Sequence, residues 1–172
     1  MATRVPPVEP GIRPELAAIE AAIRAERGGI PLLYRVLLNS PPIAEGWEKM
    51  LTAVRNRNSL PPALREMVII RVAFLNRAPY ELEAHRPIAL ANGVSEAKID
   101  ALRLPQPGVA FTPLERAVLA VTDAMTRDVQ IDDALFEPLR AHFDSRSLVE
   151  LVATIAAYNM VSRCLEALRV GH

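Results

Sequence analysis

The sequence contains a single cysteine, Cys164, among its 172 residues. One thiol cannot form an internal disulfide, a CxxC redox pair or a thiolate zinc cage. Glu66, Glu81 and His85 are residue types that can bind a metal, but their spacing matches no recognised metal motif. We therefore expect no bound metal.

The sequence also lacks a surplus of either charge, because 20 Lys and Arg residues balance 20 Asp and Glu residues. A neutral chain has no overall positive charge to attract nucleic acid or an anionic membrane. No apolar stretch reaches the roughly 20 residues that a membrane span needs. The first residues, MATRVPPVEPGIRPEL, have no apolar core like that of a signal peptide. We expect a cytoplasmic protein that binds neither nucleic acid nor membranes.

Aromatic residues are few, at 5% of the chain, and the alternating pattern of strands is hard to find. Alanine and leucine are abundant, and this composition predicts an all-α fold. A chain of this length is typical of one domain, which we place at residues 15–172. The four prolines within residues 1–14 predict an extended arm. That arm is expected to be disordered or to lie on a neighbouring subunit.

Start and stop signals divide the chain into eight or nine helical segments. Thr112, Pro113 and Glu115 form a strong helix start with a capping box, and Ser147 with Glu150 suggests a second one. The segment 61–76 has the interior MVIIRVAFL, which is apolar on every side and typical of a central helix. The expected helices cover residues 15–27, 31–39, 43–57, 61–76, 79–92, 95–104, 112–127, 132–143 and 147–169.

The most informative stretch for chemistry runs from Glu66 to His85. Glu81 and His85 are four residues apart and share a helix face, where a carboxylate can orient an imidazole for proton transfer. Tyr80 could donate a phenolic proton. Glu66 lies on the preceding buried helix, and adjacent helices would let it approach His85.

Simpler interpretations stay open for each of these residues. Glu81 and His85 could form an ordinary surface pair, and Tyr80 could be a core aromatic residue. Glu66 could pair with Arg71 and stabilise helix packing, whereas Arg71 could instead bind a substrate carboxylate.

The segment LPPALREMVIIRVAFLNRAPYELEAHRPIALANGVSEAKIDAL resembles the core motif of the carboxymuconolactone decarboxylase and alkylhydroperoxidase-D superfamily. The run LVELVATIAAYNMVSRCLEAL resembles the last helix of its members. The resemblance covers about residues 43–170. It implies a compact multi-helix bundle that forms homo-oligomers, with a pocket at helix ends near a subunit boundary.

The peroxidase branch of this superfamily has a glutamate, then a CxxC pair, then a histidine four residues after the second cysteine. Placed on this sequence, the glutamate is Glu66 and the histidine is His85. The two cysteine positions fall on Ala78 and Glu81. Disulfide-based peroxide reduction needs an attacking and a resolving thiol, so we reject that chemistry here.

In the decarboxylase branch a glutamate precedes the histidine by four, as Glu81 precedes His85. That branch acts without a cofactor on a small carboxylated lactone of aromatic catabolism. The resemblance therefore implies a cofactor-independent lyase or isomerase for such a lactone or a related enol acid. His85 would be the general acid or base and Glu81 would orient it. Glu66 with Tyr80 would relay protons or hold substrate, and Arg71 would bind the carboxylate. The alternative from another class is a non-catalytic helical oligomer that binds a ligand, with His85 occluded.

Overall fold

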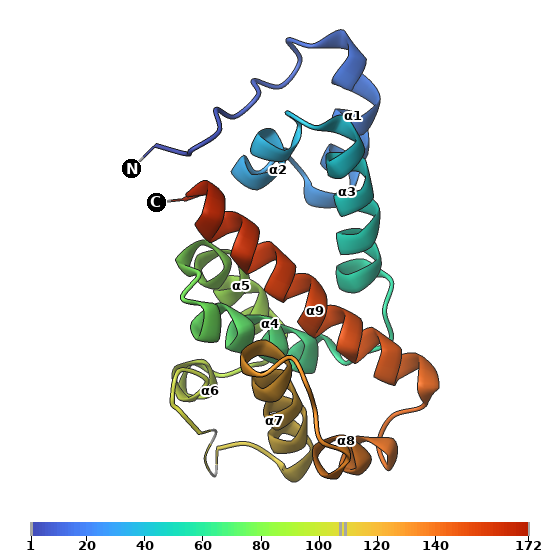
Figure 1. Ribbon diagram of the computed structural model, residues 1–172, viewed down its shortest axis with the longest axis vertical. Helices are drawn as coiled ribbons and strands as arrows, with labels where there is room; N and C mark the ends of the chain where they lie inside the picture. Colours follow the sequence, from blue (N-terminus) through green and yellow to red (C-terminus); the bar gives the residue numbers. More distant parts are fainter. Residues whose placement is uncertain (1, 107, 109, 172) are drawn as a thin grey trace. The chain divides into compact units, whose positions relative to one another are not determined.

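The computed structural model describes residues 2–106, 108 and 110–171, and every regular element within them is a helix (Figure 1). The expected all-α class is confirmed. A short 3-10 helix, η1, covers Pro14–Leu16. The α-helices are α1 (Ala17–Arg27), α2 (Leu32–Leu37), α3 (Pro41–Asn56), α4 (Pro62–Asn76), α5 (Pro79–Ala91), α6 (Glu96–Ala101), α7 (Pro113–Arg127), α8 (Asp133–Arg140) and α9 (Ser145–Leu168).

The chain divides into two compact units. The first comprises Met1–Arg57 and Leu165–His172, and the second comprises Asn58–Cys164. The single domain expected from residue 15 stays a prediction.

The N-terminal arm is ordered within the first unit. The Arg4 N–H donates to the Leu168 carbonyl at 2.8 Å, and the Val8 N–H donates to the Arg35 carbonyl at 2.9 Å. The arm thus lies against its own chain, which is neither of the two arrangements expected for it. Backbone groups need hydrogen-bond partners, and α2 and the end of α9 supply them.

Local signals explain most helix boundaries, with one exception. The Thr112 side chain accepts from the Glu115 N–H, and the Glu115 carboxylate accepts from the Thr112 N–H, as the sequence predicted. The second expected box is wrong, because Asp144 accepts from the Ser147 N–H and α9 begins two residues earlier. Glu150 instead accepts from the N–H and hydroxyl of Ser59.

Helix α4 is the centre of the second unit and packs against α5 and α7. Val68, Ile69, Ile70 and Val72 are fully buried, as the apolar pattern predicted. Hydrogen bonds join α9 to α4, α5 and α7, so α9 covers the same core.

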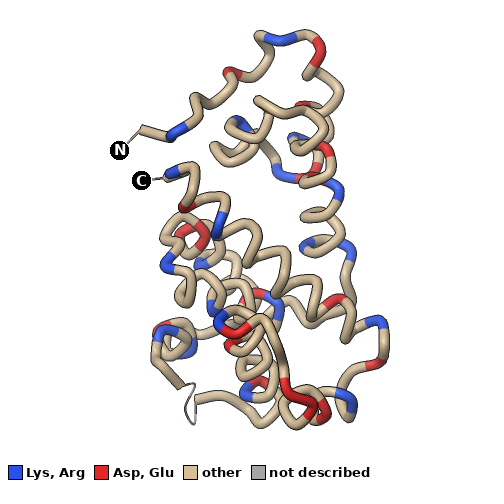
Figure 2. Tube along the Cα trace, viewed as in Figure 1, with Lys and Arg blue, Asp and Glu red and all other residues tan. Residues whose placement is uncertain are grey.

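Helix α9 is the longest helix within the described residues, as the expected segment 147–169 predicted. It carries no charge between Glu150 and Arg163, which Figure 2 shows as an uninterrupted tan stretch. By length and composition it could cross a membrane, but 56% of its most apolar window is buried inside the protein. This burial is typical of a core helix, because a bundle hides such a helix on several sides.

Candidate functional site

A histidine held between a carboxylate and a phenol forms the centre of the candidate site. The Nδ1 of His85 lies 2.7 Å from Oε2 of Glu66, and its Nε2 lies 3.1 Å from the Tyr158 hydroxyl. Glu66, His85 and Tyr158 are 1%, 4% and 2% exposed. Buried polar groups of this kind are costly unless they are hydrogen-bonded, and here they bond one another.

Two consecutive helices and a third one much later in the sequence bring these groups together. Glu66 comes from the apolar α4, His85 from α5 and Tyr158 from α9. The imidazole and phenol rings meet edge-on, with centroids 5.1 Å apart and planes at 87°. Packing and hydrogen bonding therefore fix the imidazole in one orientation, and the predicted approach of Glu66 to His85 is confirmed.

The groups at the two ring nitrogens of His85 determine where the imidazole carries its proton. With Glu66 as a carboxylate, Nδ1–H donates to it and Nε2 accepts from the Tyr158 O–H. Arg65 adds a more distant contact, because its Nε lies 3.4 Å from Oε1 of Glu66. The array can therefore pass a proton between Tyr158 and His85 while Glu66 balances the charge on the imidazole.

Glu81 has a hydrogen-bond partner on α9, and its expected role in orienting His85 stays a prediction. Its Oε2 lies 2.6 Å from the Ser162 hydroxyl on α9, and the carboxylate at 2.7 Å from Nδ1 is that of Glu66. Ser162 also lies 2.6 Å from the Tyr158 carbonyl. The Ser162 hydroxyl therefore bridges the Glu81 carboxyl group and the backbone of α9 at Tyr158. Glu81 thus fixes the turn of α9 that carries Tyr158.

Two candidates remain, Tyr80 and Arg71. Tyr80 is half-buried on the first turn of α5, and the phenol at Nε2 comes from Tyr158. Arg71 is 1% exposed and faces α7 and the segment after α6. Its guanidinium binds both oxygens of Asp123 and the carbonyls of Leu102, Leu104 and Pro105. These contacts leave it no free donor for a substrate, and they argue against the expected roles of Arg71 as a carboxylate ligand or a partner of Glu66.

Sequence reasoning missed Tyr158 and Ser162. A signal for them is present, because Thr154, Tyr158 and Ser162 recur every four residues in an otherwise apolar helix. That spacing places three hydroxyl groups on one face, and all three are buried. A buried polar stripe of this kind indicates partners on a neighbouring helix.

The second unit lacks the pair of cysteines that thiol-based peroxide reduction needs. Ala78 and Glu81 occupy the two positions where the peroxidase branch has cysteines, and Cys164 is half-buried on α9. Burial raises the pKa of the Cys164 thiol, which lowers its thiolate fraction at neutral pH.

Within the described residues, no three His, Cys, Asp or Glu side chains form a group that could hold a metal ion. The expected absence of a metal and of other cofactors stays a prediction.

Known proteins resemble this chain in sequence and in fold. The model of the carboxymuconolactone decarboxylase family matches residues 41–124. The uncharacterized protein YnjA of Escherichia coli is 30% identical over 145 residues, which are 83% of this chain and 74% of YnjA.

Two solved structures show the same fold. ATU0492 of Agrobacterium tumefaciens, a protein of unknown function, is 25% identical with a TM-score of 0.73, over 79% of this chain and 94% of that one. The debrominase Bmp8 bound to 2,3,4-tribromopyrrole is 20% identical with a TM-score of 0.80, over 98% of this chain and 91% of that one.

The matched region includes α4 and α5, which carry Glu66, Glu81 and His85. Sequence and fold agree, and the chain belongs to the carboxymuconolactone decarboxylase family, with the all-α fold of the AhpD-like proteins.

Proposed function

We propose that this protein is a cofactor-independent acid–base enzyme, a lyase or isomerase for a small carboxylated lactone or a related enol acid. The observation that carries the proposal is the Glu66–His85–Tyr158 array, with contacts of 2.7 and 3.1 Å at the two imidazole nitrogens. A general acid or base needs a proton-transfer partner within this range, and the array provides one on each side of the ring.

In a decarboxylation, the bond between the carboxylate carbon and the neighbouring ring carbon breaks, and carbon dioxide leaves. The electron pair remains on the substrate as an enolate, which must receive a proton. When both ring nitrogens of His85 are protonated, Nε2–H donates to the Tyr158 oxygen and Glu66 balances the imidazolium charge. Tyr158 then gives its own proton to the enolate carbon and takes one from Nε2. A proton from water restores the imidazolium, and the hydroxide that remains combines with the released carbon dioxide to give bicarbonate.

The test is decarboxylation, or proton exchange with deuterated water, on a panel of carboxylated lactones. We expect His85→Ala to lower the rate at least 100-fold, the usual contribution of a positioned general acid or base. Tyr158→Phe should lower the rate and keep the fold, because it removes only the hydroxyl.

His142→Ala is the matched control, because His142 is exposed on the segment after α8. Equal rates for wild type and His85→Ala would remove His85 from the mechanism.

One observation favours a second candidate, a non-catalytic oligomer that binds a ligand. His85 is only 4% exposed, and both of its ring nitrogens contact protein groups. An occluded histidine is what that alternative predicts. It also predicts that no lactone exchanges protons in the presence of the wild-type protein, whereas the acid–base proposal requires exchange that depends on His85 and Tyr158.

An alkylhydroperoxidase-like function is disfavoured, because disulfide chemistry needs a second thiol and the chain has one. Peroxide consumption with a dithiol reductant that survives Cys164→Ser would overturn this view of the thiol.

We also propose that the protein forms a homo-oligomer. Val149 on α9 is 68% exposed and lies in an apolar groove of about 310 Å³ with Phe136, Leu148, Val152 and Ala153. Contiguous exposed apolar surface is typical of an interface, and a second copy would cover it. Size exclusion with light scattering tests this, because a clean species near 18.9 kDa at all micromolar concentrations would contradict it.

A further inference from the structure

A cleft lies at the corner where α4 ends and α5 begins. Its volume is about 310 Å³, and it is lined by Ala73, Phe74, Arg77, Ala78, Pro79, Leu82 and Arg103. This volume lies at the lower end of the range for small-molecule sites. The lining is apolar apart from the two arginines.

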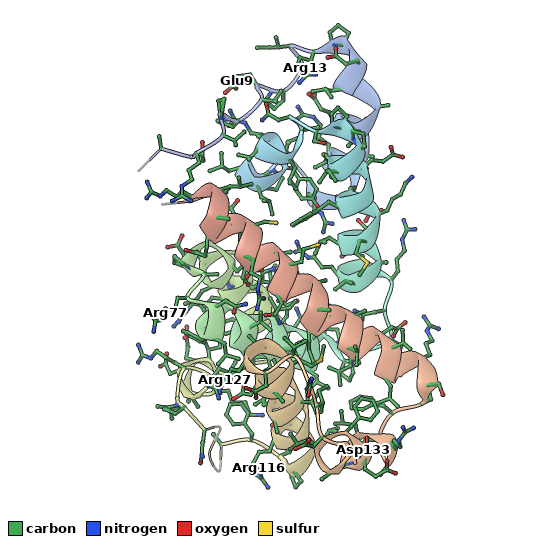
Figure 3. All side chains as sticks on the ribbon, in the orientation of Figure 1. Glu9, Arg13, Arg77, Arg116, Arg127 and Asp133 are labelled. Atoms are coloured by element: carbon green, nitrogen blue, oxygen red, sulfur yellow. The ribbon has the colours of Figure 1, made fainter. Side chains whose placement is uncertain are left out.

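Arg77 and Arg103 are both exposed, and neither guanidinium has a hydrogen bond or ion pair with the described residues. In Figure 3 the labelled Arg77 side chain extends outward from the ribbon. Two positive charges without a carboxylate partner beside an apolar surface favour an anion with an apolar body. Pro79 and Leu82 belong to the first turn of α5, whose helix dipole adds positive potential at the same place.

The backbone at Arg77 is in a costly conformation. Its φ is +55°, in the left-handed region that favours glycine. The turn is closed by the Ala78 N–H, which donates to the Ala73 carbonyl at 2.9 Å. Glycine would satisfy this helix end with less strain, so a glycine substitution can remove the Arg77 charge without a backbone penalty.

The segment that carries Arg103 is held by a buried side chain. Arg71 donates to the carbonyls of Leu102 and Leu104, which flank Arg103, at 2.6 and 2.7 Å. Hydrogen bonds from α4 thus hold the segment that carries Arg103, and Arg77 follows directly after the end of the same helix.

We propose that this cleft binds a small organic anion. Arg77 and Arg103 bind its carboxylate or phosphate group, and its apolar body packs on Ala73, Phe74 and Leu82. The proposal does not depend on the acid–base function, because the cleft shares no residue with the Glu66–His85–Tyr158 array.

The experiment is a titration of the ¹⁵N-labelled full chain followed by amide chemical shifts, with benzoate, phenyl phosphate, benzamide and inorganic phosphate as probes. We expect benzoate or phenyl phosphate to shift the amides of Arg77, Ala78 and Arg103. Neutral benzamide should bind at least tenfold more weakly than benzoate, and inorganic phosphate more weakly than phenyl phosphate. The better of the two anions identifies the group that the arginines prefer.

Arg77→Gly is the decisive variant, because it removes the charge and relieves the backbone strain together. It should weaken anion binding about tenfold without lowering the melting temperature, and Arg103→Gln should weaken binding similarly.

Arg169→Gly is the matched control. Arg169 is an exposed arginine with φ +53°, and the next N–H, that of Val170, donates to the Leu165 carbonyl at 2.9 Å. The variant Arg169→Gly should leave anion binding unchanged. Equal affinity for benzoate and benzamide, undiminished binding to Arg77→Gly, or shifts that map away from the cleft would each overturn the proposal.

Discussion

Replacing Arg71 tests whether this side chain supports the fold or serves a substrate. Arg71 has five N–H donors, and each has a protein acceptor: two carboxylate oxygens of Asp123 and three carbonyls of the segment after α6. In Arg71→Met these acceptors lose their donors while the side-chain volume is roughly kept. Asp123 is left with a weaker contact, at 3.4 Å from the Arg127 guanidinium.

We expect Arg71→Met to lose much of the protein's stability, because the Arg71–Asp123 ion pair is buried. The Arg71 side chain is 1% exposed and that of Asp123 is 15% exposed. Removing one partner of a buried ion pair costs about 3–5 kcal/mol. A domain of this kind has about 5–15 kcal/mol of total stability, so the variant loses a large fraction of it. Arg71→Lys should also destabilise, by about 2 kcal/mol or more, because a lysine has three donors and no planar fork.

Urea unfolding followed by circular dichroism at fixed chain concentration measures these differences. Arg24→Met is the control, because Arg24 is an exposed arginine on α1 and its loss should change stability by less than about 0.5 kcal/mol. If Arg71 served only to bind a substrate, Arg71→Met would unfold at the same urea concentration as the wild type. A cost below about 1 kcal/mol would therefore refute the structural role.

Three further predictions concern other positions. Hydrogen bonds from the Ser59 hydroxyl, then from its N–H, hold the pKa of Glu150 below its usual value. A depressed carboxyl pKa contributes stability above the unfolded-state value and loses it as pH falls through the folded value. Ser59→Ala should thus have a lower free energy of unfolding than the wild type at pH 7 and the same one near pH 2. Urea unfolding at both pH values measures this difference. Val129 has φ +68°, which a β-branched residue tolerates poorly, so Val129→Gly should stabilise by about 1 kcal/mol in the same assay; a loss of stability would contradict the strain. Burial raises the pKa of the Cys164 thiol, so iodoacetamide at pH 8 should alkylate it more slowly than it alkylates N-acetylcysteine; an equal rate, measured by mass spectrometry, would contradict this.

The order and type of the helices could be predicted because they depend on local signals. Thr112 and Glu115 set a helix start by contacts within one turn, and Gly93 ends one with φ +86°. The failure at Ser147 and Glu150 has a long-range cause. Glu150 lies close to Ser59, 91 residues away in sequence, and that contact replaces the local one. A capping signal is reliable only where no distant partner competes for the carboxylate.

The site was predictable in part for the same reason. The type of chemistry followed from Glu66, Glu81 and His85, which lie within 20 residues on two consecutive helices. The hydrogen-bond partners of His85 and Glu81 could not be predicted in this way, because Tyr158 and Ser162 belong to the distant helix α9. Spacing by four places Glu81 and His85 on one face, but helix packing decides which carboxylate meets Nδ1.

Helix α4 uses two buried charges in chemically different ways. Every donor of the Arg71 guanidinium is directed to a fixed protein acceptor, so this side chain holds structure. Glu66 instead contacts the His85 imidazole, which can accept or donate a proton, and the Tyr158 hydroxyl contacts the far side of the same ring. A buried charge whose partners cannot titrate stabilises a fold, whereas a buried charge in a chain of titratable partners allows proton movement. Only the second kind could support the acid–base chemistry that we propose, and in this helix it is found at Glu66.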